Sequence, residues 1–170
     1  MAYEFYVKIK AKKQGAIKGE SLREKRKDWM TGIAYFHEIK APRDVATGHA
    51  SGKRQHGAVT FSKEWGAASP QLAQALCTNE ILETVEFEFI KTNAEGLEYV
   101  YQTILLKNAS VCGIKYMTGS GAGEGAASAK HTSTHDTHEL ESVSFSYEYI
   151  EVHNKDAKTS YIDNWKDQGG

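Results

Sequence analysis

The sequence predicts a mostly β protein, an antiparallel two-sheet β-barrel or sandwich with one α-helix and a long protruding loop. Apolar and polar residues alternate over about seven short segments, which is the pattern of half-buried strands joined by hairpin connections. Only one segment carries a helix start signal followed by an apolar stripe. A polar connection over residues 41–56 has no periodicity of its own, and such long loops are usually functional or disordered.

Composition favours a single globular domain over residues 1–170, with 40% hydrophobic and 25% charged residues. The 21 lysines and arginines nearly cancel the 22 aspartates and glutamates, so no global field attracts nucleic acid or an anionic membrane. No window approaches the ~18 apolar residues of a membrane span, and the start lacks the pattern of a cleavable signal peptide. We therefore expect a soluble protein made in the cytoplasm, with no nucleic-acid partner and no membrane insertion.

The first half of the chain predicts three strands. Phe5, Val7 and Ile9 alternate with polar residues after the start, and the pattern returns over 29–39, where Phe36 lies on the more polar face. After the polar loop it continues over 59–65. These segments are expected to bury one face each.

One helix is expected over about residues 69–79. Ser69 is placed to cap the first turn, and Pro70 suits the first helical position because its φ is already fixed. Leu72 and Leu76 lie on one apolar stripe, and Asn79 is a plausible stop.

Four further strands are expected over 82–91, 97–107, 110–117 and 139–152. Residues 93–96 form a short hairpin loop between the first two. Residues 118–130 are rich in glycine, alanine and serine and are expected to form a flexible loop. Tyr161 and Trp165 give the tail aromatic anchors, so we expect it to pack back onto the domain.

Candidate chemistry is sparse. His131, His135 and His138 resemble a metal-binding cluster in composition, but in a strand entry their spacing scatters the rings over both faces. The glycines of residues 119–125 lack the helix and the lysine that a phosphate loop requires. Cys77 and Cys112 are expected to be buried free thiols. No arrangement of nucleophile, base and acid stands out, so we expect no enzyme, no cofactor and no metal.

Four cations gather in the connection after the first strand, namely Arg23, Lys25, Arg26 and Lys27. Such a run can bind nucleic acid, but no aromatic residue is interleaved to stack on bases. A solvated surface or a charged protein contact is the favoured interpretation.

A set of segments occurs in an order that resembles the haemolysin-coregulated protein (Hcp) family, the tube subunits of bacterial type VI secretion systems. The segments are Ala-Lys-Lys-Gln-Gly-Ala-Ile at 11–17, His-Glu-Ile-Lys-Ala-Pro-Arg-Asp at 37–44, Ser-Gly-Lys-Arg-Gln-His at 51–56, Ala-Ser-Pro at 68–70, the strand at 85–89, Glu-Tyr-Val-Tyr at 98–101, His-Glu-Leu-Glu-Ser-Val-Ser-Phe-Ser-Tyr at 138–147 and Asp-Asn-Trp at 163–165. The likeness spans nearly the whole chain. It thins over residues 119–129 and at Gly57.

The resemblance implies a structural protein without catalysis. It implies hexameric rings that stack into a hollow tube, which is expelled from the cell and carries or chaperones effectors. The implied partners are further copies of the chain, the secretion sheath, baseplate and spike proteins, and effector proteins. The implied location is the cytoplasm before firing and the exterior or a target cell afterwards.

A tube needs a ring contact that closes and a second contact along its axis. We expect the loop at 41–56 to make the second contact, since it is polar enough for a free ring to stay soluble and its cations can meet carboxylates on the next ring. The expected ring-stacking residues are Pro42, Arg43, Asp44, Gly48, Lys53 and Arg54. Phe36 is a candidate for the lumen wall. The alternative is a small-ligand or metal-binding β-barrel that uses His131, His135 and His138.

Overall fold

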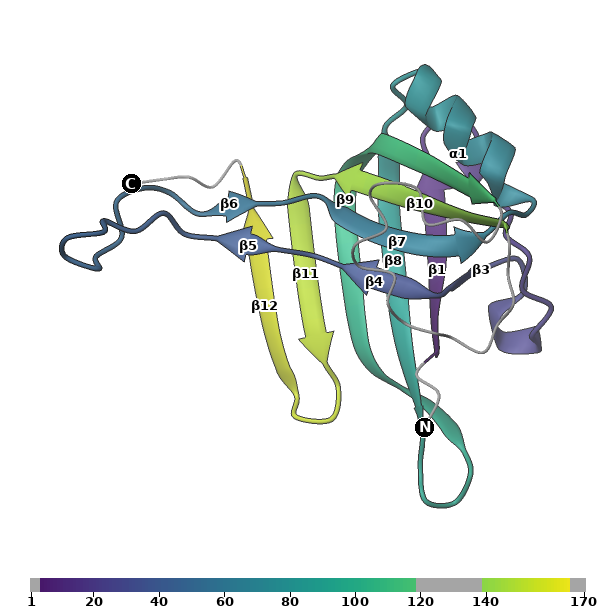
Figure 1. Ribbon diagram of the computed structural model, residues 1–170. Coiled ribbons are helices and arrows are strands. Elements are labelled where there is room, and N and C mark those ends of the chain that lie inside the picture. Colours follow the sequence, from purple (N-terminus) through teal and green to yellow (C-terminus); the bar gives the residue numbers. More distant parts are fainter. Residues whose placement is uncertain (1–3, 119–138, 166–170) are drawn as a thin grey trace.

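The computed structural model describes residues 4–118 and 139–165 (Figure 1). Its strands are β1 (Glu4–Ala11), β2 (Gly15–Ala16), β3 (Met30–Gly32), β4 (Ala34–Phe36), β5 (Ile39–Lys40), β6 (Gln55–His56), β7 (Val59–Glu64), β8 (Leu82–Thr92), β9 (Glu98–Thr118), β10 (Glu139–Ser146), β11 (Tyr149–Asn154) and β12 (Thr159–Asn164). A 3₁₀ turn covers Glu24–Arg26, and the helix α1 covers Ala68–Cys77. The predicted fold class is confirmed.

The strand order shows how the two sheets join. Hydrogen-bonded neighbours run β2-β1-β8-β9-β10-β7-β4, with β11 and β12 continuing from β9 on a separate branch. β3 pairs with β1 and the following β4 pairs with β7, so consecutive short strands connect the two ends of this order. Every paired ladder is antiparallel, as expected from hairpin connections.

Strand β9 belongs to both sheets. Its first part lies between β8 and β11, and its last part pairs with β10. Our expectation of two strands over 97–107 and 110–117 is therefore wrong. Asn108 lies between the two parts with φ at 48°, a left-handed conformation that asparagine tolerates better than most residues. The turn-like residues there turn the strand without ending it.

Two other predicted strands are divided because their parts have different partners. The segment 139–152 becomes β10, which pairs with β7 and β9, and β11, which pairs with the other part of β9 and with β12. The segment 29–39 becomes β3, β4 and β5, which pair with β1, β7 and β6.

The helix occurs where expected, but its start differs in detail. Ser69 is its second residue and does not cap it, because the cap position is Ala67; the Ser69 hydroxyl accepts from the Gly66 N–H at 3.0 Å and donates to Glu141 Oε1 at 2.7 Å. Pro70 still lies in the first turn, where its missing N–H is not needed. Asn79, with φ at 50°, follows the last turn as expected.

The core lies between the two sheets and beneath α1. Phe61 and Phe145 stack with ring centroids 5.7 Å apart, and Phe87 packs edge-on against both. Leu72 of α1 is fully buried. Cys77 and Cys112 are free thiols, but both are exposed, so the expected burial is wrong. Cys77 is the outward last residue of α1, and Cys112 lies where the register of β9 shifts against β10.

Candidate functional site: the arm and its root

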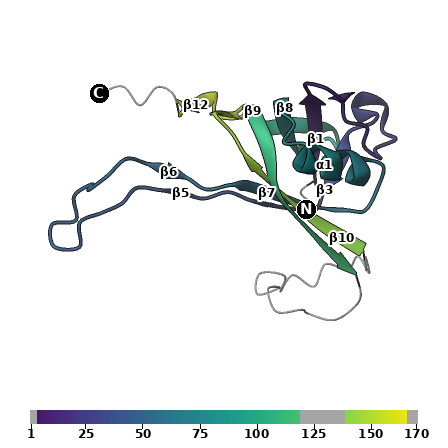
Figure 2. The same cartoon turned by 90° about the horizontal axis from the view of Figure 1, so that it is seen from above.

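Residues 39–56 form a projection that we call the arm, and it extends well beyond the sheets (Figures 1 and 2). At its base Ile39 pairs with His56 through β5 and β6. Farther out, the Ser51 N–H donates to the Pro42 carbonyl at 3.0 Å, and Arg43 pairs with Ala50 in an isolated bridge. The predicted irregular loop is thus a two-stranded ribbon with rungs along its length.

The tip of the arm is a turn closed by hydrogen bonds around Asp44. The Asp44 carbonyl accepts from the Gly48 N–H at 2.8 Å, and its carboxylate accepts from the Ala46 N–H at 2.8 Å. Gly48 has φ at 72°, which glycine adopts without steric cost. Val45 is fully exposed at this turn. The arm therefore presents a preformed end to its surroundings.

The root of the arm is bound to β12 by an ion pair. Arg54 donates through Nη2 to Asp163 Oδ1 at 2.5 Å and through Nε to Oδ2. His56 Nε2 lies 2.6 Å from the same Oδ2. The Arg54 hydrogen bonds are the main reason that the pKa of Asp163 falls to about 2, so this carboxylate is ionised at neutral pH. The bidentate geometry fixes the direction in which the arm leaves the body.

A second contact joins both strands of the arm to the body. The Tyr147 hydroxyl, on the link between β10 and β11, lies 2.6 Å from His37 Nε2 and 3.2 Å from His56 Nδ1. The two imidazole rings are parallel, with centroids 6.0 Å apart. The pKa of His37 is lowered, first by burial and then by His56, and burial raises the pKa of Tyr147. We call His37, Arg54, His56, Tyr147, Asp163 and Trp165 the root cluster.

Trp165 completes this cluster. Its ring centroid lies 5.7 Å from that of His56. Its backbone N–H donates to the Glu148 carbonyl at 2.9 Å, and this bond holds the segment after Asp163 on the body. A cavity of about 190 Å³ lies beside it, lined by His56, Gly57, Ala58, Ser146, Tyr147 and Trp165. The tail therefore packs against the domain, as its aromatic anchors predict.

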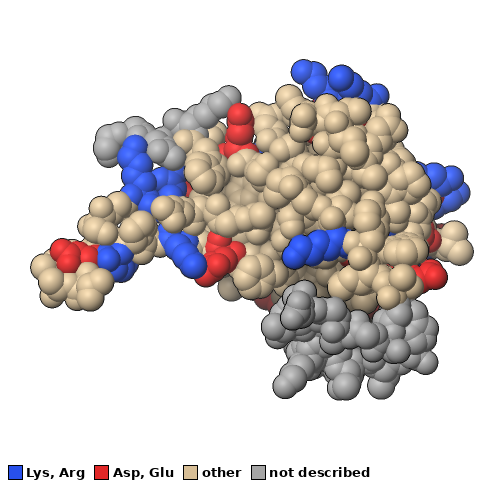
Figure 3. Space-filling model, turned by 45° about the horizontal axis from the view of Figure 1, so that its top comes forward, with Lys and Arg blue, Asp and Glu red and all other residues tan. Residues whose placement is uncertain are grey.

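The predicted stacking residues are distributed between the arm and its root. Arg43, Asp44, Gly48 and Lys53 are exposed along the arm, and Pro42 is half-buried. Charges of both signs follow the projection (Figure 3). Arg54 already binds a carboxylate of its own chain, that of Asp163. Phe36, the candidate lumen residue, is 63% exposed on β4. His131, His135 and His138 lie outside the described residues.

The basic connection before β3 is largely neutralised within the chain. Arg23 binds Glu98 and Glu4, and Arg26 binds Glu88. Both guanidinium groups also lie over the ring of Tyr6. Since these carboxylates occupy the arginines, the structure gives the nucleic-acid interpretation no support.

Sequence reasoning missed two charged groups that the structure brings together. Lys63 and Glu141 are fully buried and directly opposite each other on β7 and β10, with Nζ 2.8 Å from Oε1. A signal was present, because both occupy the inward positions of their strands. The members of the root cluster all lie in segments that resemble the Hcp family, but no pattern within the sequence shows that these segments meet.

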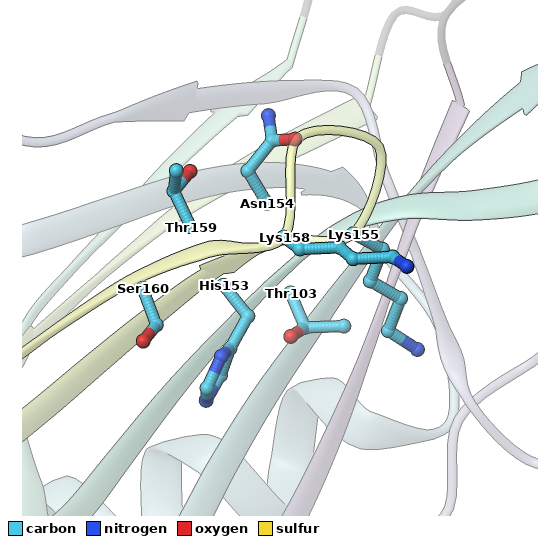
Figure 4. Close-up of a pocket in the computed structure, with 7 residues that line it drawn as sticks. All are labelled: Thr103, His153, Asn154, Lys155, Lys158, Thr159 and Ser160. Atoms are coloured by element: carbon cyan, nitrogen blue, oxygen red, sulfur yellow. The ribbon is translucent and has the colours of Figure 1, made fainter.

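A shallow pocket of about 410 Å³ lies over the β11–β12 hairpin (Figure 4). Thr103, His153 and Ser160 lie side by side on three neighbouring strands, and the pocket is rimmed by the exposed Lys155 and Lys158. The His153 ring is bound to Glu151. Nothing in this arrangement directs convergent groups at a ligand.

Residues 4–118 and 139–165 contain no group of three metal-ligating side chains placed around one point. Within the same ranges, no helix has the length and apolar character needed to cross a membrane.

Comparison with known proteins agrees with the fold. The family model described as type VI secretion system effector, Hcp, matches residues 6–153. The chain is 32% identical over 175 residues to the major exported protein of Pseudomonas aeruginosa, covering 98% of this chain and 97% of that relative. A crystal structure of an Hcp protein superposes with a TM-score of 0.83 at 26% identity, covering 99% of this chain and all of that one. The Hcp1 protein of the E. coli EAEC 042 pathovar superposes with a TM-score of 0.80 at 28% identity, covering 96% and 99%. The chain belongs to the Hcp family of type VI secretion proteins.

Proposed function

We propose that this tube subunit assembles into hexameric rings, that the rings stack into a hollow tube, and that the arm makes the contact between successive rings. The observation that carries the proposal is the arm itself. It is a hydrogen-bonded ribbon, fixed at its root by Asp163, with an exposed tip at which Val45 follows Asp44. A projection that docks on the next copy in the same way each time generates a continuing stack.

The ring contact is proposed to use the edge of β12. In the described chain this strand pairs only with β11, and Tyr161 and Ile162 on it are 40% and 56% exposed. An unpaired strand edge presents N–H and C=O groups that a neighbouring copy can satisfy. A contact between two different surfaces closes into a ring when the rotation between copies is an integral fraction of a turn.

Membership of the family supports the remaining roles that we propose. The chain acts without catalysis, and its lumen, to which we assign Phe36, holds effector proteins. Its other partners are the sheath, baseplate and spike of the secretion apparatus. Rings assemble in the cytoplasm, and the tube is then exported.

Light scattering coupled to size-exclusion chromatography tests the ring, and negative-stain electron microscopy tests its symmetry. We expect a hexamer with sixfold end views from the full chain. A monomer over a wide concentration range would overturn the ring proposal.

The arm is tested by removing its tip. Because Arg43 and Ala50 are paired across the ribbon, residues 44–49 can be replaced by Asn-Gly, which forms a two-residue hairpin turn. Rings are expected to persist, while stacks in the micrographs and export by cells that carry a complete secretion apparatus are lost.

A charge reversal tests the arm without shortening it. Arg43→Glu with Lys53→Glu should weaken stacking, and Lys12→Glu with Lys25→Glu is a control of equal net charge at exposed sites on the body. Equal stacking and export by the two double variants would contradict the assignment of the arm as the axial contact.

A further inference from the structure

The Tyr147 hydroxyl contacts three groups, and it cannot form hydrogen bonds with all three while both histidines are neutral. It contacts His37 Nε2, His56 Nδ1 and the Gly57 carbonyl, the last at 3.2 Å. The Gly57 carbonyl can only accept, and the hydroxyl has a single proton to donate. The number of protons on the two rings therefore decides which contacts are hydrogen bonds.

The state of His56 is constrained on its other side. Its Nε2 faces the ionised Asp163 carboxylate and so carries a proton. If the ring is neutral, Nδ1 accepts the Tyr147 proton, and the Gly57 carbonyl receives none from that hydroxyl. If the ring is charged, Nδ1 donates to Tyr147 and the hydroxyl proton goes to Gly57. One added proton thus fills every contact.

A second proton, added to His37, fills none of these contacts. His37 Nε2 must donate to Tyr147 in either state, so charging this ring creates a second imidazolium parallel to that of His56, 6.0 Å away. The ring is partly buried, and both burial and His56 lower its pKa.

Among the described residues, the acidic groups around the cluster each have another partner. Glu148, next to Tyr147 in the chain, accepts from Asn108. Asp163 already serves Arg54 and His56. Tyr161 of β12 and Tyr35 of β4 contribute only hydroxyl groups, whose pKa values are raised. Glu38, next to His37 in the chain, is paired with Lys40.

We propose that the root cluster is a two-step proton latch, in which His56 accepts one proton with the arm held and His37 accepts a second that releases the arm. His37 lies on the link from β4 into the arm and His56 on β6, by which the chain leaves the arm, and a single hydroxyl ties both to the body. Repulsion between the charged rings therefore acts on the root, where the arm is joined to β10–β12. The latch is a property of the chain itself. The further expectation that release of the arm dismantles stacked rings rests on the proposed function.

Hydrogen exchange read by mass spectrometry tests the latch on the full chain. Peptides that cover the arm are compared with those of the hairpin at residues 93–96, after correction for the intrinsic pH dependence of exchange. Between about pH 7.5 and about pH 5 we expect exchange in the arm to rise roughly tenfold relative to that hairpin. Parallel behaviour of the two regions would overturn the latch.

Three variants separate the steps. His37→Gln keeps an N–H for Tyr147 and cannot be charged, so its arm should stay protected in acid. His49→Gln, at the exposed tip, is the matched control and should release like the parent. Tyr147→Phe should leave the arm poorly protected at every pH. Release of His37→Gln at the same pH as His49→Gln would refute the role of His37.

Electron microscopy of the same samples separates the latch from the stacking proposal. If the stacks and the protection of the arm are lost together, both the latch and the stacking proposal are supported. If the arm is released in acid and the stacks persist, the latch stands and the axial role of the arm is wrong.

Discussion

Lys63 and Glu141 form a fully buried ion pair in the body. Besides the pair itself, Lys63 donates to the Glu64 carbonyl at 2.7 Å, and Glu20 lies 3.7 Å away. Glu141 also accepts from Ser69 on α1. The Ser69–Glu141 hydrogen bond therefore ties the helix to β10, and the ion pair extends this connection to β7.

Breaking this pair from one side should be costly. Lys63→Met or Glu141→Gln leaves a buried group without its charged partner, and each is expected to lower the free energy of unfolding by about 3–5 kcal/mol. The double change Lys63→Met with Glu141→Leu should cost much less than the sum of the two single changes.

Urea denaturation measures these differences. Lys10 and Glu83, an ion pair 3.1 Å apart on the surface, supply the control, and removing either should cost under about 1 kcal/mol. Equal costs at the buried and exposed pairs would contradict the prediction.

The pairing of Asp163 makes the free energy of unfolding depend on pH. Its pKa is lowered to about 2 in the folded state, so its pairing stabilises the fold above its ordinary pKa, and this contribution is lost as the pH falls through about 2. The lowered pKa of His37 adds a loss of stability that begins as the pH falls below about 6.5.

Asp163→Asn should therefore be less stable than the parent at pH 7, with the difference shrinking as the pH approaches 2. Thermal unfolding followed by circular dichroism over this range measures it. A difference that does not change with pH would show that the carboxylate charge is not what stabilises the root.

At the scale of elements, the alternation of apolar residues located the strands well but not their ends. Phe5, Val7 and Ile9 of β1 are buried as expected, and so are Val85 and Phe87 of β8. Where β10 gives way to β11, the alternation changes phase, from Val143 and Phe145 to Ile150, and such a shift also fits a bulge within one strand, so the two strands could not be separated. Conversely, Asn108 gave the signal of a turn within one continuous strand.

Asn108 is expected to tolerate glycine better than a β-branched residue. Its φ of 48° suits glycine, although Asn108→Gly loses the hydrogen bond to Glu148 at 3.1 Å. Asn108→Val should cost about 1–3 kcal/mol, because a bulky residue is strained in this conformation. Chemical denaturation of both variants checks the order of stability. A valine variant as stable as the glycine variant would show that β9 can turn here without a left-handed residue.

At the scale of the whole molecule, the sequence supported the family and the position of the arm, whereas the root cluster depends on packing. His37, Tyr147 and Asp163 are separated by long stretches of chain, and only the crossing of the arm over β12 brings them together. Contacts of this kind have no local periodicity, which is why reasoning from the sequence assigned Arg54 to another copy.

The edge of β12 should decide the oligomeric state. Ile162→Glu places a charge on the proposed ring contact, and we expect it to give folded monomers in light scattering. Leu22→Glu is the control, since Leu22 is 92% exposed on the connection before the 3₁₀ turn. Hexamers from both variants would exclude β12 from the ring.

The continuity of β9 also has a mechanical consequence. Because one strand of 21 residues forms ladders with β8, β10 and β11, a pull along its length loads many hydrogen bonds in parallel. Tension that pulls the two strands of the arm apart instead opens its rungs one after another, from the root toward the tip. Under tension the arm should therefore yield first and the body last, and a subunit stretched during export would keep its sheets intact while its projection unzips.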